Sequence, residues 1–228
     1  MAAFELLGQA GRHRVLRDLR VGAVTVNRPA CLSIPARYSG EVVVTAPSAR
    51  QRLVEVASRL FYAEGIHAAG VDRVIVEARV AKATLYAHFA SKEELVAAYL
   101  ERQSAWWVAA VEERADSPGG LLARALAPFD VLAERAARPG YRGCPFINAA
   151  AEFPEPGPVA DQISRHRRRV RDTFADLLDR TDEDPGLLDV IVALYDGAMT
   201  GAYLDRDPAV VNHARRGAEE LLGRCGSW

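Results

Sequence analysis

The chain has 228 residues, of which 50% are hydrophobic and 26% are charged, and its formal net charge is −1. This is the balance of an ordinary globular protein with enough length for one large or two small domains, and it excludes a uniformly polycationic nucleic-acid binder. We find no uninterrupted apolar run of the roughly 18 residues that a transmembrane helix needs, and no basic flank before an apolar core near the start, so we expect neither a membrane span nor a secretory signal.

Cysteine and histidine are scattered along the chain. Cys31, Cys144 and Cys225 lie far apart and form no CxxC pair, which is typical of reduced thiols in a cytoplasmic protein. The five histidines show no metal-ligand spacing such as HxxxH, and no Cys/His/Asp arrangement indicates a catalytic nucleophile. We therefore expect no metal site, no cofactor and no enzymatic activity.

Residues 1–47 differ from the rest of the chain. They carry more arginines than acidic residues, and Pro29 and Pro35 interrupt their short strand-like stretches. Three interpretations stay open: a basic arm that contacts DNA phosphates, a disordered extension without a role, or upstream sequence translated from a misassigned start near residues 42–44. We expect one of the last two.

Regular structure is predicted to begin at Ser48. Ser48 and Gln51 fit a capping box, and apolar residues then recur at the i, i+3, i+4 and i+7 spacing of an amphipathic helix. Gly65 has the position and residue type that end a helix. Two shorter helices are predicted to follow, over residues 71–78 and 81–89.

The segment from Val71 to Lys92, VDRVIVEARVAKATLYAHFASK, is the most informative part of the chain. Its apolar positions let two short helices cross over a small core, while hydrogen-bonding side chains between them face outward, as a reader of the DNA major groove requires. The order AxVxKxTLYxHFxSKEEL, from Ala78 to Leu95, resembles the recognition helix and following helix cap of the TetR family of bacterial transcriptional regulators. Arg79 and Ala83 depart from the family pattern, because glycine is common at both positions.

The resemblance implies that the N-terminal end of the third helix, residues 81–84, approaches the base edges of DNA. Lys82 is the best candidate for a guanine contact, because its ammonium group can reach O6 or N7. Thr84 is expected to contact a phosphate or a thymine methyl group. Ala81 and Ala83 are small and permit close approach.

Other residues of the same unit are expected near the phosphates. Tyr86 and Lys92 are implied phosphate contacts, together with backbone amides at helix N-termini. His88 has a competing role in capping or packing. Arg50 and Arg52 either clamp the DNA backbone or form a solvated pair. Residues 50–92 contain seven basic and four acidic residues, which is a modest positive excess.

Six further helices are predicted after residue 90. Ser91 and Glu94 fit a second capping box, which begins a long helix that runs to about residue 114. Breaks rich in proline and glycine then separate five more helices, over residues 121–138, 144–153, 159–180, 187–204 and 207–222. The prediction is an all-α, TetR-like chain of about nine helices, with a helix-turn-helix domain over 48–92 and a larger effector-binding and dimerisation domain over 93–228.

The same resemblance implies a small-molecule effector site in the second domain. The segment CPFINAAAE, residues 144–152, resembles one beside the ligand cavity in a subgroup of the family. Candidate effector-binding residues are Trp106, Trp107, Phe129, Tyr141, Cys144, Phe146, Asn148 and Tyr195. Aromatic residues at helical spacing also form plain hydrophobic core, so both interpretations stay open for each of them. Asn148, if buried, needs a ligand or a neighbouring backbone group as its partner.

Two less specific signals lie in this second domain. Cys144 stands near a helix N-terminus, which lowers the pKa of a thiol, yet no second cysteine is near it in sequence and a redox role is not our expectation. The basic run from Arg165 to Arg171 is interpreted mainly as the solvated face of a helix, with a second anionic contact as the alternative.

Gly197 and Gly201 lie four residues apart on the eighth predicted helix. Small residues at this spacing let two helix backbones approach closely, either within one subunit or across a two-fold axis. Members of the TetR family dimerise through their last two helices, so the resemblance favours a homodimer interface at both glycines.

Together these features predict a cytoplasmic, homodimeric regulator that binds a palindromic DNA operator and is released by a small-molecule effector. Repression is expected from the resemblance alone. The alternative is a helical ligand-binding protein or enzyme that has kept the fold and lost DNA binding. A non-specific architectural DNA protein would need a far more basic chain.

Overall fold

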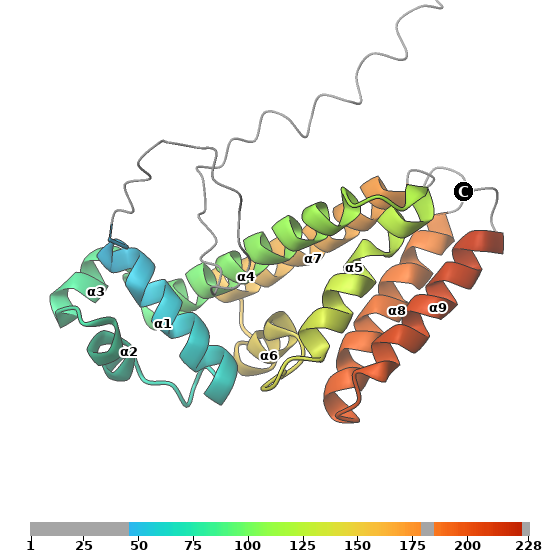
Figure 1. Ribbon diagram of the computed structural model, residues 1–228. Coiled ribbons are helices and arrows are strands. Elements are labelled where there is room, and N and C mark those ends of the chain that lie inside the picture. The colour runs from blue at the N-terminus through green and yellow to red at the C-terminus, as the bar shows by residue number, and fades with distance from the viewer. Residues whose placement is uncertain (1–45, 179–184, 225–228) are drawn as a thin grey trace, which may run out of the picture. The chain divides into compact units, whose positions relative to one another are not determined.

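The structure describes residues 46–178 and 185–224, and within these ranges it consists of nine helices without a strand (Figure 1). In this computed structural model the helices are α1 (Ala49–Glu64), α2 (Val71–Ala78), α3 (Lys82–His88), α4 (Lys92–Ala115), α5 (Gly120–Ala136), α6 (Pro145–Glu152), α7 (Pro158–Leu178), α8 (Pro185–Leu204) and α9 (Ala209–Arg224). The predicted all-α fold is confirmed for the described residues. The expectations for residues 1–45, Cys31 and Cys225 fall outside these ranges.

The predicted capping box at the start of α1 is present. The backbone N–H of Ser48 donates to Oε1 of Gln51 at 2.7 Å, and the N–H of Gln51 donates to Oγ of Ser48 at 3.2 Å. The two bonds satisfy amides that would otherwise lack partners at a helix N-terminus, and they fix where α1 begins.

The turn between α2 and α3 forces Arg79 into the left-handed region, at φ 54° and ψ 51°. The turn is closed by the N–H of Arg79, which donates to the carbonyl of Val76, and by the N–H of Val80, which donates to that of Ile75. Left-handed backbone costs a residue with a Cβ roughly 1–2 kcal/mol. Arg79 therefore carries backbone strain that a glycine would avoid, and the helix-turn-helix geometry forms despite it.

The start of α4 differs in one detail from the predicted capping box. Oγ of Ser91 accepts the N–H of Glu94 at 3.2 Å, as expected. The carboxylate of Glu94 reaches back to the N–H of Ala90 at 2.8 Å, one residue before the cap. The two bonds still close the turn between α3 and α4 and hold α3 at a fixed angle to the long helix.

Two hydrophobic clusters share α4. The first joins α1, α2 and α3 to the N-terminal half of α4 and to α6, and it includes Leu85, Tyr99 and Phe146. The second joins the C-terminal half of α4 to α5, α7, α8 and α9, and it includes Trp107 and Phe174. Because one helix supplies side chains to both clusters, a shift of α4 is felt in both. The predicted domain boundary at residue 92 stays a prediction. The first cluster extends past it along α4, as far as Leu100.

The helix α8 qualifies the expectation that no segment is apolar enough to cross a membrane. Gly186–Leu204 reaches that threshold by length and composition, and 28% of its apolar window is buried inside the chain. Its inner face, which includes Ile191 and Tyr195, packs in the second cluster. The core helix of a soluble protein passes the same test, so the finding carries no membrane assignment, but it identifies an apolar helix with an uncovered outer face.

Candidate nucleic-acid interface and ligand cavity

The helix α3 buries one side and exposes the other. Leu85 is fully buried in the first cluster, whereas the side chain of Lys82 is 63% exposed and Tyr86 is 49% exposed. Thr84 is half-buried, and Ala81, Ala83 and His88 are exposed. Of the residues of this segment that are predicted from the sequence to face DNA, all but Thr84 are exposed.

Lys82 makes an ion pair with Asp72 of α2, with Nζ 3.1 Å from Oδ1. The hydrogen bond with Asp72 raises the pKa of Lys82, so its ammonium group is charged at neutral pH. Exposed pairs of this kind contribute little free energy. The lysine can therefore exchange this partner for a base or a phosphate at small cost.

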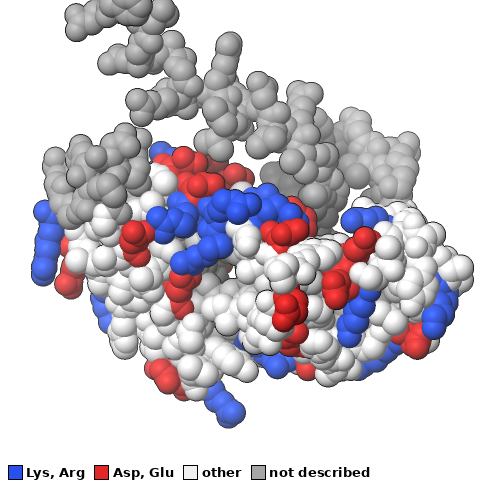
Figure 2. Space-filling view, turned by 180° about the vertical axis from the view of Figure 1, so that it is seen from behind, with Lys and Arg blue, Asp and Glu red and all other residues white. Residues whose placement is uncertain are grey.

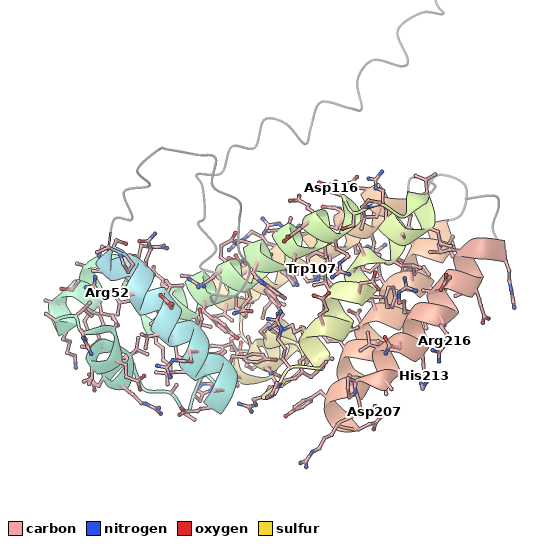
Figure 3. The ribbon with its side chains drawn as sticks, in the orientation of Figure 1. Arg52, Trp107, Asp116, Asp207, His213 and Arg216 are labelled. Carbon is pink, nitrogen blue, oxygen red and sulfur yellow. The ribbon has the colours of Figure 1, made fainter. Side chains whose placement is uncertain are left out.

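Arg52 and Arg50 have intramolecular partners. Nε of Arg52 donates to the carbonyl of Ala78 at 3.2 Å, and its Nη1 donates to that of Pro47 at 2.8 Å. The guanidinium of Arg50 lies over the ring of Phe89, 5.2 Å from the centroid. Arg52, which Figure 3 labels on α1, thus supports the turn at residue 79 from inside the unit. Neither sequence interpretation anticipated this arrangement.

Lys92 and His88 are placed differently from each other. Nζ of Lys92 contacts the carbonyl of His67 at 3.5 Å and lies 5.9 Å from the ring centroid of Phe61, and partial burial lowers its pKa. His88 is exposed, with its ring edge-on to Phe89. Lys92 is therefore half-buried, whereas His88 is exposed on the candidate surface of α3.

Two further arginines of this unit are already paired with acids. Arg73 binds Glu64 and Glu77, and Arg59 binds Glu77 as well. These pairs connect α1 to α2. They also neutralise charge, as does the pair of Lys82 with Asp72. Among the described residues of this unit, the basic side chains without a carboxylate partner are those of Arg50, Arg52, Arg79 and Lys92.

A cavity of about 300 Å³ lies among α4, α5, α6, α7 and α8. Six of the eight predicted effector residues line it: Trp106, Trp107, Tyr141, Cys144, Phe146 and Tyr195. Trp107 points from α4 into the bundle (Figure 3). The size and the mostly apolar wall are typical of a small-molecule site.

Phe129 and Asn148 do not line the cavity, so these two predictions are corrected. Phe129 is fully buried in the second cluster, where its ring packs edge-on against Phe174 and Tyr195. Nδ2 of Asn148 donates to the carbonyl of Arg142 at 3.0 Å. Of the two partners expected for Asn148, a ligand or a backbone group, the structure shows the backbone group.

The sequence interpretation missed the polar residues of the cavity wall: Gln103, Arg135, His166, Arg167 and Asp196. His166 lies within the basic run and was grouped with its solvated face. It stands three residues after Ile163 and four before Val170, both of which line the cavity. Helical periodicity therefore contained the signal that this histidine faces inward.

His166 is held between an aromatic ring and a hydroxyl group. Its ring stacks on Phe146 with centroids 3.6 Å apart, and Nδ1 is 2.9 Å from Oγ of Ser104. Burial, with added repulsion from Arg169, Arg167 and Arg135, lowers the pKa of His166 to about 3. The imidazole is therefore neutral at physiological pH.

Cys144 is a packing residue of the wall. Burial raises the pKa of its thiol, which opposes the thiolate form that redox sensing requires. Cys144 is a free cysteine, and the described residues contain no cluster able to hold a metal ion.

Comparison with known proteins supports the geometry. A model of the bacterial regulatory proteins of the tetR family matches residues 53–99, and a tetracyclin repressor-like C-terminal domain model matches residues 121–218. The crystal structure of SCO4454, a TetR-family transcriptional regulator from Streptomyces coelicolor, is 38% identical, with a TM-score of 0.70, over 77% of this chain and 95% of that one. The chain belongs to the TetR family.

Two other relatives fit this assignment. A putative TetR transcriptional regulator from Streptomyces avermitilis (sav143) is 27% identical, with a TM-score of 0.64, over 76% of this chain and 99% of that one. The HTH-type transcriptional activator FasR of Mycolicibacterium smegmatis is 34% identical over 142 residues. That match spans 60% of this chain and 61% of FasR, which is less than two thirds of its length. The chain is thus a TetR-family transcriptional regulator, in a family of regulators rather than enzymes.

In this TetR-family chain, residues next to the cavity wall are bonded directly to the end of α1 and to the loop after it. Nη1 of Arg142 donates to the carbonyls of Tyr62 and Ala63, at 3.2 and 2.6 Å. The carboxylate of Glu152, at the end of α6, accepts the backbone N–H groups of Ile66 and His67, at 2.9 and 2.5 Å. Hydrogen bonds therefore connect the end of α1 and the α1–α2 loop to residues next to the cavity.

The two glycines of α8 have different surroundings. A Cβ on Gly201 would lie 3.0 Å from Cγ1 of Val210, so this glycine serves the packing of α8 against α9 within the chain. Gly197 is exposed, and a Cβ there would meet nothing within 4 Å. Gly197 therefore remains a candidate for the dimer interface, whereas Gly201 has a packing role within the chain.

The basic run of α7 is largely neutralised. Arg167 binds Asp196 and Arg171 binds Asp189, each at 2.6 Å, while Arg169 lies 3.6 Å from Glu101. Figure 2 shows this band of basic side chains with acidic side chains beside it. The expected solvated face is present, and its charges are too well paired to favour a second anionic site.

Proposed function

We propose that this TetR-family regulator binds a palindromic DNA operator as a homodimer and is released when a small molecule occupies the cavity. The observation that carries the proposal is the accessible surface of α3. It presents Lys82, Thr84 and Tyr86 above a buried Leu85, so that rigid packing fixes the direction of hydrogen-bonding side chains. We further propose a cytoplasmic location and repression as the default outcome, although the FasR relative is named an activator.

The proposed DNA contacts follow from side-chain chemistry. Lys82 exchanges Asp72 for O6 or N7 of a guanine in the major groove, while Tyr86 contacts a phosphate. Ala81 and Ala83 keep this end of α3 free of bulk, so that the helix can enter the groove. Arg50 lies beside this surface on Phe89 and is proposed as a further phosphate contact.

The proposed dimer uses the outer face of α8. Val190 is 47% exposed and Leu204 is 69% exposed on the same helix as the open Gly197. An apolar helix face of this kind is stable when a second copy covers it. Two-fold symmetry would then place the two α3 helices on successive major grooves, about 34 Å apart.

The proposed release follows from the bonds between the cavity wall and α1. A ligand that repositions α6 or the loop before it acts on Tyr62, Ile66 and His67 through Arg142 and Glu152. Such a ligand lowers operator affinity only by binding more tightly to the conformer that does not fit DNA.

The test begins with in vitro selection of DNA by the full-length protein. The selected duplex and a scrambled one are then compared by fluorescence anisotropy over a range of salt concentrations. A palindromic consensus, bound roughly 10³-fold or more tightly than the scrambled duplex, supports the proposal. Equal binding to both duplexes would indicate an architectural protein, and no binding to either would favour the helical ligand-binding alternative.

A further inference from the structure

The charges in the cavity wall do not cancel. Nη1 of Arg167 and Oδ2 of Asp196 are 2.6 Å apart and neutralise each other. Arg135 has no carboxylate partner among residues 46–178 and 185–224. It donates to Oε1 of Gln103 at 3.3 Å, and its guanidinium lies 4.9 Å from the ring centroid of Trp106 and 5.3 Å from that of Tyr62. The uncompensated charge of the wall is therefore positive.

The hydrogen bonds of Ser104 determine the tautomer of His166. Nη1 of Arg169 is 2.8 Å from Oγ of Ser104, and because arginine only donates, the serine oxygen accepts this bond. The single hydroxyl proton of Ser104 is then available for Nδ1 of His166 at 2.9 Å. Within the described residues the hydroxyl of Ser104 makes no bond to the carbonyl one turn earlier in α4, in contrast to Ser58 of α1, which donates to the carbonyl of Val54. Nδ1 is thus an acceptor, and the neutral ring carries its proton on Nε2.

Nε2–H of His166 has no acceptor among the described residues, although the ring forms part of the cavity wall. A second donor is left over at Tyr195, whose hydroxyl oxygen accepts Nε1–H of Trp107 at 2.9 Å and keeps its own proton. With Arg135, the wall therefore offers donors and a positive charge to whatever fills the cavity. A ligand with acceptor oxygens and a negative charge complements it.

The rest of the cavity wall determines the polarity and the size of the ligand that fits. Aromatic rings and aliphatic side chains make up most of the surface, so the body of the ligand is apolar. A cavity of about 150 Å³ accommodates benzene, so the 300 Å³ here suits about a dozen non-hydrogen atoms. Aromatic walls also suit organic cations, but the carboxylate of Asp196 is already paired and Arg135 would repel a cation.

We propose that the cavity takes an apolar organic carboxylate of about a dozen non-hydrogen atoms, with the carboxylate held by Arg135 and Nε2–H of His166. The inference rests on the proposed function for its regulatory meaning. Arg135 links the two roles, because its guanidinium also lies on Tyr62 of α1. A carboxylate that draws Arg135 into the cavity removes that contact with the helix-turn-helix.

The charge of the ligand is tested by calorimetry on the full-length protein with three compounds of one shape: 2-naphthoate, 2-naphthamide and 2-naphthylmethylammonium. The expected result is that naphthoate binds at least about tenfold more tightly than naphthamide, and the ammonium compound more weakly than both. Equal affinities for naphthoate and naphthamide, tighter binding of the ammonium compound, or no binding of naphthoate at millimolar concentration would each overturn the inference.

The residue assignment is tested by Arg135→Met. This variant should lose the preference for naphthoate and keep the affinity for naphthamide. Arg138→Met, which removes an exposed arginine just past the end of α5, is the matched control and should bind both compounds as the wild type does. If the folded Arg135→Met variant keeps the wild-type preference for naphthoate while the control behaves as expected, Arg135 is removed from the proposal.

The tautomer is tested by ¹⁵N NMR of histidine-labelled protein. The wild type should show His166 protonated at Nε2, and Ser104→Ala should show a mixture of tautomers together with severalfold weaker naphthoate binding. A proton on Nδ1 in the wild type would contradict the argument. Operator binding is measured on the same samples, so that specific DNA binding without a carboxylate preference would refute this inference alone, and the reverse would refute the proposed function alone.

Discussion

Around α3 the hydrogen-bonding side chains face solvent over a small buried core, whereas around the cavity they face inward among aromatic rings. Lys82 has one exposed partner that it can exchange. His166 is fixed by a buried serine, and that serine is fixed in turn by Arg169. The first region suits a large, charged partner such as DNA. The second suits a small and mostly apolar ligand, because the polar groups that would hold its one charged end are already fixed in the wall.

The largest expected effect lies on neither surface but at the proposed two-fold axis. Gly197→Arg should leave the subunit folded, because a Cβ at this position meets nothing within 4 Å. It should abolish the dimer, since an unpaired charge buried at an interface costs about 3–5 kcal/mol. Analytical ultracentrifugation measures the outcome, with Ala109→Arg on the exposed face of α4 as control. A Gly197→Arg variant that stays dimeric would exclude this face of α8 as the interface.

Lys82→Ala tests the outward-facing region. We expect a loss of about 1–3 kcal/mol of operator binding per half-site, with the melting temperature and the dimer unchanged. Arg168→Ala, which removes an exposed arginine of α7, is the control for total charge. Wild-type affinity of Lys82→Ala in an anisotropy titration would remove this lysine from the interface.

The two regions differ in how far the sequence alone could describe them. Around α3, the alternation of Leu85 with Lys82 and Tyr86 is local, so helical periodicity was enough to predict which side faces solvent. The cavity depends on contacts between distant segments, such as Ser104 with His166, and no local pattern encodes them. Phe129 and Tyr195 are both aromatic residues of predicted helices, and both are buried in the structure. Only Tyr195 lines the cavity, because helix packing decides which side of the core each one faces.

The inward-facing region has a pH signature. The pKa of His166 is about 3 in the folded chain against 6.5 in its ordinary environment. Below pH 6.5 the unfolded chain therefore binds a proton that the folded chain does not, and stability falls as the pH falls. Between pH 6.5 and 5 this group should remove about 1.5 kcal/mol from the free energy of unfolding.

Denaturant unfolding at several pH values measures this slope. His166→Asn keeps an acceptor near the position of Nδ1 and removes the titration, so its stability should vary less over the same pH interval. Parallel slopes for the wild type and His166→Asn would show that His166 is not buried in its neutral form.

The smallest effect is expected at the turn between the two helices of the outward-facing region. Arg79→Gly relieves left-handed strain of about 1–2 kcal/mol but adds flexibility to the unfolded chain, so the net gain in stability should be about 0.5 kcal/mol. Thermal unfolding measures it. A lower melting temperature would mean that Arg79 makes contacts that outweigh its backbone strain.

The central claim is that two copies of α3, paired through α8, read successive major grooves of one duplex. Hydroxyl-radical and guanine-methylation footprinting on the selected operator test it together. We expect two protected patches on one face of the duplex, centred about 34 Å apart, each with a guanine whose N7 is protected by the wild type and exposed by Lys82→Ala. A single patch, or protection that is the same with and without Lys82, would contradict the account.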